Sequence, residues 1–266
     1  MNVKSVVKVM NFHSLLHVDQ ARRRADRYGA MKDELESMMR IVLNNRNLRL
    51  DKHIKLPDPN KPVLRIYLGS DLGFCGSVNS SVSKVIAEDE ARNEKIVVGK
   101  KLRKPKEVSY YVTRDDLAEH FADVKQYLER AVRERCWSAV ELVYNHYYNL
   151  SSIKQEVQRI YPLELKEQET TGDAKDDLLD DFMFEGDPDR MIEDMVIEYL
   201  VCELKIAATS SYASENIMRQ NATSESLKKL DEQEAEELRI MRKERSLKAV
   251  QKTTDSYIKQ KSLERT

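Results

Sequence analysis

The segment LRIYLGSDLGFCGSVN, residues 64–79, carries the strongest indication of the fold class of this chain. The run Val63–Leu68 is mostly apolar and short, which is typical of a buried strand. A glycine-rich turn follows it, and the pattern then predicts a helix over Val78–Arg92. A strand, a turn and a helix in this order open an α/β unit. The segments on either side of this unit are long and favour helix throughout.

The whole α/β unit is expected to span residues 57–188. Apolar runs predict further strands, and the region between the third and fourth strands predicts a helix over Leu117–Arg135. Strands that alternate with helices imply a mixed or mostly parallel sheet covered on both faces, as in a Rossmann-like domain. Residues 163–188 are acidic and are expected to form a loop. The further strands are expected at Lys95–Val98, Val108–Val112, Ala139–Tyr148 and Glu156–Leu165.

Two helical segments, residues 1–56 and 189–266, flank the α/β unit. The first contains one glycine and no proline, and the second contains neither. Asp187 is expected to cap the second helix, with Pro188 at its first position. An unbroken helix over 189–266 would reach roughly 115 Å and would not be stable alone. We therefore predict that the two helices form an antiparallel coiled coil. The final part of the second helix has no partner left in this chain and is expected to need another protein around it. The expected seams are Tyr28, Met31, Leu35, Met38 and Val42 on one helix, and Leu227, Leu230, Leu238 and Met241 on the other.

The composition of the 266 residues limits the class of protein. The net charge is −1, the charged fraction is 34%, and mean hydropathy is negative. No apolar run approaches the roughly 18 residues of a membrane span, and the first residues lack the apolar core of a signal peptide. The three cysteines, Cys75, Cys136 and Cys202, favour a reducing compartment. Residues 1–55 and 239–266 are rich in basic side chains and 163–198 in acidic ones; such blocks are solvated faces or steer a partner.

The glycine turn does not match a nucleotide site. A P-loop needs lysine after its last glycine, but Ser77 follows Gly76, and the glycine spacing differs from that of a dinucleotide fingerprint. We interpret it as a tight turn in which glycine lets two backbones approach. Cys75 has no readable histidine partner and is expected to be packed rather than nucleophilic. His13 and His17 lie one helical turn apart, but no third metal ligand is evident.

Other candidate sites have plain structural interpretations. The basic run Arg22, Arg23 and Arg24 fits a solvated helix face, a protein contact or a nucleic-acid contact, and the run carries no interleaved aromatic residues for base stacking. Four aromatic residues are expected to pack on the sheet: Trp137, Tyr144, Tyr147 and Tyr148. No catalytic constellation, metal site or cofactor site is predicted.

Three motifs carry a resemblance to a known family. SDLGFCGSVN at 70–79 resembles the SDRGLCGGLN signature of the gamma subunit of F-type ATP synthases. VYNHY at 143–147 resembles the VYN.F strand of that family, and residues 210–223 resemble its SE..AR.MAM.NAT segment. The three occur in the family's order and cover nearly the whole chain. The signature positions are Ser70, Asp71, Gly73, Cys75, Gly76, Asn79, Asn221, Ala222 and Thr223.

The resemblance implies a central rotor shaft with no catalytic site of its own. In that family the coiled coil enters a ring of three alpha and three beta subunits, and the middle domain sits with epsilon on the membrane c-ring. Ion-driven rotation is thereby coupled to ATP synthesis or hydrolysis. The implied place is peripheral, on the cytoplasmic face of a bacterial inner membrane or the matrix side of the mitochondrial one. No nucleic acid and no transmembrane span are implied. Expected stator contacts are Arg22, Arg23, Arg24, Arg242, Arg245 and Lys248.

The chain also departs from the family pattern. Ser211 and Glu215 stand where the pattern has glutamate and arginine, and residues 247–253 replace its RQ..IT pattern, at the place of the family's ionic contact between shaft and stator. The first helix is expected to be short at its inner end. A specialised F1-like motor, a homodimeric coiled-coil scaffold and an α/β nucleotide-binding enzyme remain as alternatives.

Overall fold

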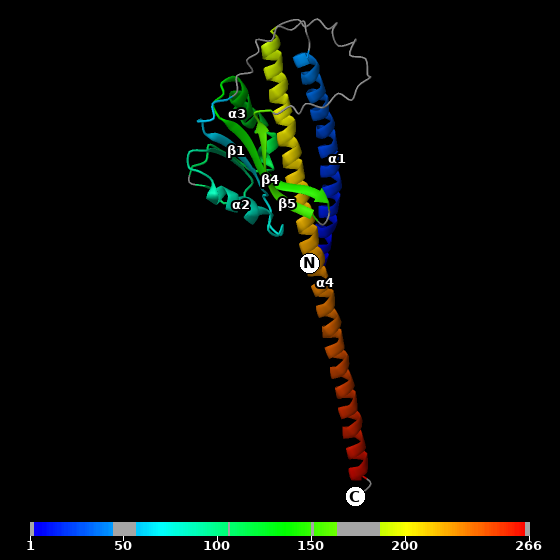
Figure 1. The fold of residues 1–266 in the computed structure, drawn as a ribbon. Coiled ribbons are helices and arrows are strands. Elements are labelled where there is room, and N and C mark those ends of the chain that lie inside the picture. The colour runs from blue at the N-terminus through cyan, green and yellow to red at the C-terminus, as the bar shows by residue number, and fades with distance from the viewer. Residues whose placement is uncertain (1–2, 45–56, 106, 150–151, 164–186, 264–266) are drawn as a thin grey trace.

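A computed structural model describes residues 3–44, 57–105, 107–149, 152–163 and 187–263. Along the chain, a five-stranded sheet domain falls between two long helices, α1 (Val3–Asn44) and α4 (Pro188–Leu263), as the sequence predicts. In space the two helices lie side by side, with the sheet domain on one side of the pair (Figure 1). The acidic segment 164–186 falls outside the described residues. None of the helices in these ranges combines the length and the apolar character that a membrane-crossing helix needs.

The sheet has the order β3-β2-β1-β4-β5. The first four of these strands are parallel, and β4 and β5 form an antiparallel hairpin at one edge. The strands are β1 (Val63–Leu68), β2 (Glu94–Val98), β3 (Tyr110–Val112), β4 (Ala139–Asn149) and β5 (Ser152–Tyr161). The expected mixed sheet is therefore confirmed.

Helices cover both faces of the sheet. On one face, Tyr67, Val97 and Val143 pack against α2 (Val78–Glu88). On the other, Leu64 and Leu142 are among the strand residues that share a core with α3 (Phe121–Arg133) and α4. Alternate side chains of a strand point to opposite faces, so two separate cores result. Trp137 and Tyr144 are buried in the second core, as expected, and Tyr147 is half-buried. The expectation is wrong for Tyr148, which is 52% exposed.

Several element boundaries differ from the sequence prediction. Helix α2 ends at Glu88 rather than Arg92, because Asp89 is extended and its carboxylate accepts hydrogen bonds from Tyr67, Arg65 and Asn93. The predicted helix over Leu117–Arg135 is a 3-10 turn, Asp116–Ala118, followed by α3; the chain leaves α3 near Arg135, whose φ is 51°. Strand β3 is shorter than expected. Strand β5 begins earlier because it pairs along the length of β4.

Helix α4 begins where its capping residue predicts. Asp189 N donates to the Asp187 carboxylate at 3.1 Å, and Met191 N donates to Asp187 O at 3.1 Å. From there α4 continues for 76 residues, about 114 Å at 1.5 Å per residue. It lies between the sheet and α1, then runs on alone past the end of α1 (Figure 1).

The two long helices pair antiparallel, and the predicted seam on α1 is correct at Tyr28, Leu35 and Val42 but wrong at Met31 and Met38. Met31 and Met38 are about half exposed, whereas Met39 is 1% exposed and Lys32 also faces α4. Positions separated alternately by three and four residues face α4 along the whole of α1, which is the coiled-coil pattern. These positions are Lys4, Val7, Asn11, Ser14, Val18, Ala21, Ala25, Tyr28, Lys32, Leu35, Met39 and Val42.

On α4, the predicted seam is only partly correct. Leu227 and Leu230 are half-buried, but Leu238 and Met241 are 52% and 47% exposed. The last ion pairs between the helices join Lys4 to Asp231 and Glu234, so the apolar residues beyond them have no partner on α1 within the described chain.

Candidate functional site

Helix α4 is fastened to the ends of the central strands by three serines. Ser214 Oγ donates to Asn145 O at 2.9 Å, and Ser211 Oγ donates to Leu68 O at 3.4 Å. Ser210 Oγ accepts a hydrogen bond from the Tyr147 backbone N–H at 2.9 Å. Small hydroxyl side chains let the helix lie close to the strands while satisfying their backbone groups. This junction, where the sheet domain meets α4, is the candidate functional site.

The glycine turn after β1 is braced internally by Ser70, Cys75 and Asn79. Asn79 accepts a hydrogen bond from Ser70 N at 3.0 Å and donates to Ser70 Oγ at 2.7 Å. Its amide also lies 3.2 Å from the buried Cys75 sulfur. Cys75 is thus placed as a packed residue of the turn. These three positions of the family signature therefore fix the shape of the turn.

Two glycines of this turn differ in what they require. Gly76 has a φ of 57°, and a Cβ there would lie 2.6 Å from Met218 Cε on α4. Glycine is therefore favoured mainly by the left-handed backbone, because the crowding involves only the flexible end of the Met218 side chain. A Cβ on Gly73 would meet nothing within 4 Å. The predicted approach of two backbones is therefore wrong at Gly73 and at Gly76, where the close atom belongs to a side chain. It is found at Gly69, the first glycine of the turn, since a Cβ on Gly99 would lie 2.9 Å from the backbone carbon of Gly69.

Asp71 ties the turn to two neighbouring loops. Its carboxylate accepts backbone hydrogen bonds from Lys100 at 2.7 Å, Arg114 at 3.2 Å and Asp115 at 3.1 Å. Burial acts to raise the pKa of Asp71, but these three donors together with the Arg114 charge outweigh burial and hold that pKa below its ordinary value. The loop that carries Arg114 is therefore fixed to the turn by a charged group.

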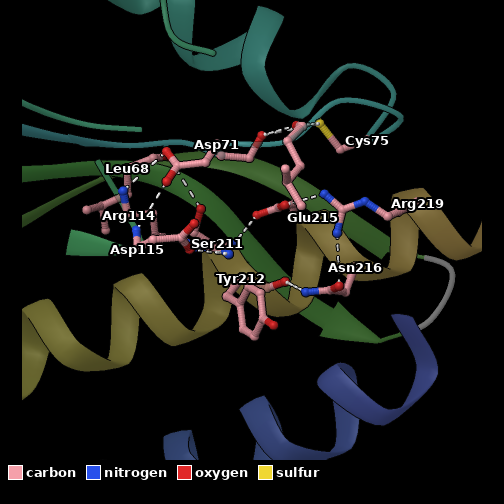
Figure 2. Close-up of polar contacts among 12 residues, drawn as sticks. Leu68, Asp71, Cys75, Arg114, Asp115, Ser211, Tyr212, Glu215, Asn216 and Arg219 are labelled. Atoms are coloured by element: carbon pink, nitrogen blue, oxygen red, sulfur yellow. Dashed lines mark hydrogen bonds and ion pairs between the residues drawn. The ribbon is translucent and has the colours of Figure 1, made fainter. Parts of the chain in front are cut away.

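Glu215 of α4 lies between two arginines (Figure 2). Arg114 reaches it from the loop after β3, and Arg219 reaches it from the next turn of α4. The Glu215 side chain is 1% exposed, and those of Arg114 and Arg219 are 20% and 9% exposed. Arg114 also lies over the Tyr212 ring, 4.2 Å from its centre. A buried carboxylate needs such partners, because an unpaired buried charge is strongly destabilising.

The electrostatics of Glu215 differ from those of Asp71. Burial raises the pKa of Glu215, and Arg114 and Arg219 oppose that rise. Arg219 completes the junction, since it donates to Asn216 Oδ1 at 3.1 Å and lies 3.4 Å from the carbonyl oxygen of Gly73. Turn, loop and helix are thus joined by one connected set of charged hydrogen bonds, which are stronger than neutral ones.

Polar contacts also join α4 to α1. The Asn11 amide donates to Thr223 Oγ1 and to Gln220 O, each at 3.0 Å. Lys32 Nζ lies 3.4 Å from the buried Glu203 carboxylate, which also accepts hydrogen bonds from Gln158 and Tyr199. Thr223 is 3% exposed. These contacts fix the register of the coiled coil at two heights.

The remaining candidate residues lie away from the junction. The run Arg22, Arg23 and Arg24 is exposed on α1, and Arg23 pairs with Asp19. Arg242, Arg245 and Lys248 are exposed on the unpaired part of α4. Asn221, which is exposed, and Ala222, which is half-buried, follow the junction residue Arg219 on α4. The His13 ring is 6.3 Å from that of His17, which packs on Tyr212. No group of three or more potential metal ligands occurs among the residues that the structure describes.

Sequence reasoning missed four residues of these contacts: Arg114, Arg219, Asn11 and Glu203. For Glu215 a signal existed, because a departure from the family pattern that reverses a charge requires a compensating charge nearby. For Arg114 no local signal exists, since it lies 101 positions before its partner. Both departures, Ser211 and Glu215, fall within this one junction.

Comparisons with known proteins agree with this architecture. The ATP synthase family model matches residues 1–248. The ATP synthase gamma chain of Clostridium perfringens (strain SM101 / Type A) is 27% identical over 245 residues, which cover 87% of this chain and 83% of that relative. The gamma chain of Leptospira biflexa serovar Patoc (strain Patoc 1 / Ames) is 22% identical over 239 residues, which cover 83% and 81%.

A solved structure shares the fold. It is the central stalk and c-ring of the Tetrahymena thermophila mitochondrial ATP synthase, with a TM-score of 0.55 and 19% identity, over 83% of this chain and 99% of that one. The family model spans nearly the whole sequence, and the relatives named above are ATP synthase gamma chains; this chain therefore belongs to the ATP synthase gamma-chain family.

Proposed function

We propose that this chain is the central rotor shaft of an F1-type ATPase and has no catalytic site of its own. The observation that carries the proposal is helix α4, which is fixed in the sheet domain over its first half and extends beyond α1 without a partner in the described chain. A bare helix of this length needs surrounding protein, because isolated helices gain little stability from propensity alone.

The proposed mechanism is differential contact. A shaft changes the state of a surrounding site only if it binds that site's conformations unequally. The unpaired part of α4 offers chemically different sides, with exposed apolar residues such as Leu238 and Met241 among basic residues such as Arg242 and Arg245. Turning such a surface inside a ring would present a different contact to each subunit in turn.

The proposed partners follow from the two ends of the molecule. Alpha and beta subunits would surround the free part of α4, with Arg22, Arg23, Arg24, Arg242, Arg245 and Lys248 as contacts. The sheet domain would contact an epsilon subunit and a membrane c-ring. We assign residues 1–56 and 189–266 to the shaft and residues 57–188 to the foot, at a membrane surface as a peripheral protein. We assign the nine signature positions, from Ser70 to Thr223, to the structure of the glycine turn and of α4 and not to catalysis.

The first experiment is purification of the tagged full-length chain with its native partners. Three alpha-type and three beta-type subunits per chain are expected. A homodimer without these subunits would instead support a coiled-coil scaffold and contradict the proposal.

A truncation series tests the shaft itself in the assembled complex. Deletion of residues 239–266 removes the basic part of α4 and is expected to lower ion pumping per ATP hydrolysed. Deletion of only 260–266 is the matched control, and coupling should largely survive it. Unchanged pumping per ATP after the longer deletion would show that this part of α4 is not the shaft.

A further inference from the structure

Resting on the proposed rotor function, we propose that the ion cluster of Arg114, Glu215 and Arg219 is the torsional coupling between foot and shaft. Glu215 is its central positioning residue. The cluster sets how stiffly the sheet domain follows rotation of α4. Figure 2 shows its members, with Glu215 on α4 and Arg114 reaching it from the sheet domain.

The contacts form a closed circuit. Asp71 holds the backbone of Arg114, and the Arg114 guanidinium binds Glu215. Glu215 binds Arg219, and Arg219 Nε approaches the carbonyl oxygen of Gly73 at 3.4 Å. The circuit thus starts and ends in the glycine turn and passes through α4. Rotation of α4 about its own axis would have to lengthen at least one of these contacts.

Other contacts at the junction resist such rotation less. Apolar packing is non-directional and depends on buried area rather than angle. The hydrogen bonds of Ser210, Ser211 and Ser214 are neutral and single. Charge-assisted hydrogen bonds are shorter and about twice as strong as neutral ones, and burial strengthens them further. The directional part of the joint therefore resides mainly in the ion cluster.

The charges of the circuit balance. Asp71 and Glu215 supply two negative charges, and Arg114 and Arg219 supply two positive ones. Removing the charge of Glu215 leaves two guanidinium groups facing each other across the junction. The Tyr212 ring beside Arg114 also limits the swing of that side chain. The Glu215→Gln variant keeps the size of the side chain and removes its charge, so it tests the charge rather than the packing.

The experiment measures torsional stiffness in the assembled complex. The alpha–beta ring is immobilised, and a gold rod is attached to the foot through Ala87→Cys, an exposed position on α2, in a Cys136→Ser background. Without ATP, the angular variance of the rod is inversely related to the stiffness between foot and ring. We expect larger variance in Glu215→Gln and in Arg114→Met. The double variant should show less than the sum of the two increases, because both remove the same contact.

The control variant is Arg65→Met. It breaks a buried ion pair whose partners, Asp89 and Glu141, lie in the sheet domain. It should lower the melting temperature and leave the variance unchanged. Unchanged variance in the Glu215 and Arg114 variants, or an equal increase in the Arg65 variant, would overturn the inference alone. Failure of the wild-type chain to assemble with a ring or to turn the rod with ATP would overturn the rotor function, and this inference with it.

Discussion

Asn11 of α1 donates a hydrogen bond to Thr223 of α4 at 3.0 Å, across the seam of the coiled coil. Thr223 closes the family's C-terminal signature, and Asn11 occupies a heptad position that apolar residues usually fill. A polar residue at such a position fixes register at some cost in stability. This last residue of the signature therefore takes part in a contact between α4 and α1.

This contact predicts the behaviour of an Asn11→Leu variant. The chain should keep or gain thermal stability, because an apolar residue suits the seam, but it should lose a unique register. The measurement is cross-linking of cysteines placed at Val7 and Leu227 in the Asn11→Leu background, compared with pairs displaced by one turn. A single cross-linked pair, as in the parent chain, would contradict the expectation. Cross-links only between chains, in either background, would contradict the intrachain coiled coil.

The ion pair between Lys32 and the buried Glu203 carboxylate predicts that removing the lysine destabilises the chain. In Lys32→Met, Glu203 keeps its hydrogen bonds to Gln158 and Tyr199 but loses its cation. We expect a loss of about 1–3 kcal/mol in unfolding free energy, the usual cost of a buried polar group that loses a partner. Chemical denaturation measures this loss. The double variant Lys32→Met, Glu203→Gln should recover part of it, and an equal or larger loss would contradict the assigned pair.

The two glycines of the turn form a matched pair. Gly76→Ala must adopt a left-handed backbone, which costs roughly 1–2 kcal/mol, and must also displace Met218. Gly73→Ala meets open space and should change stability by less than about 1 kcal/mol in either direction. Denaturation midpoints of the two variants give the comparison. Equal losses would show that neither the left-handed backbone nor the contact with Met218 requires glycine at position 76.

The lowered pKa of Asp71 predicts that the unfolding free energy falls as the solution becomes acidic. A carboxylate whose pKa is lowered by folding contributes stability above its ordinary pKa of 3.8 and loses it as the pH falls through the lower folded value. Unfolding free energy should therefore fall more steeply below about pH 4 in the parent chain than in Asp71→Asn. Urea denaturation across this range is the measurement. Glu215, whose pKa is raised, acts in the opposite direction, so Glu215→Gln should not flatten the same limb.

The exposed apolar residues of α4 predict a separation of folding from assembly. Replacing Leu238 and Met241 with serine should change the stability of the isolated chain by no more than about 0.5 kcal/mol each, because both side chains are exposed. The same changes should weaken retention of the ring subunits during purification. A large loss of stability in the isolated chain would show that these residues pack within it.

The helices and strands can be predicted from local sequence patterns, whereas the contacts between distant segments cannot. Strand β1 has the predicted bounds, since an apolar run between a proline and a glycine turn is a local signal. The α1 seam differs from the prediction at Met31 and Met38, which are apolar but exposed. The position that faces α4 next to Met31 is held by Lys32, whose cation is matched by Glu203. The junction of Arg114 with Glu215 joins distant segments, and no spacing in one segment encodes it.

The two parts of the continuous α4 helix are also expected to differ in how cooperatively they unfold with the rest of the chain. Residues before about Asp231 share a core or a seam with other elements, whereas residues 235–256 are exposed on every side. Segments without tertiary contacts open at little free-energy cost and do so independently of the core. In the isolated chain, amide hydrogens of the end of α4 should exchange rapidly while those of the sheet stay protected, and helical signal should decline on heating before the core melts. Partner subunits would then complete the folding of the very helix that they enclose.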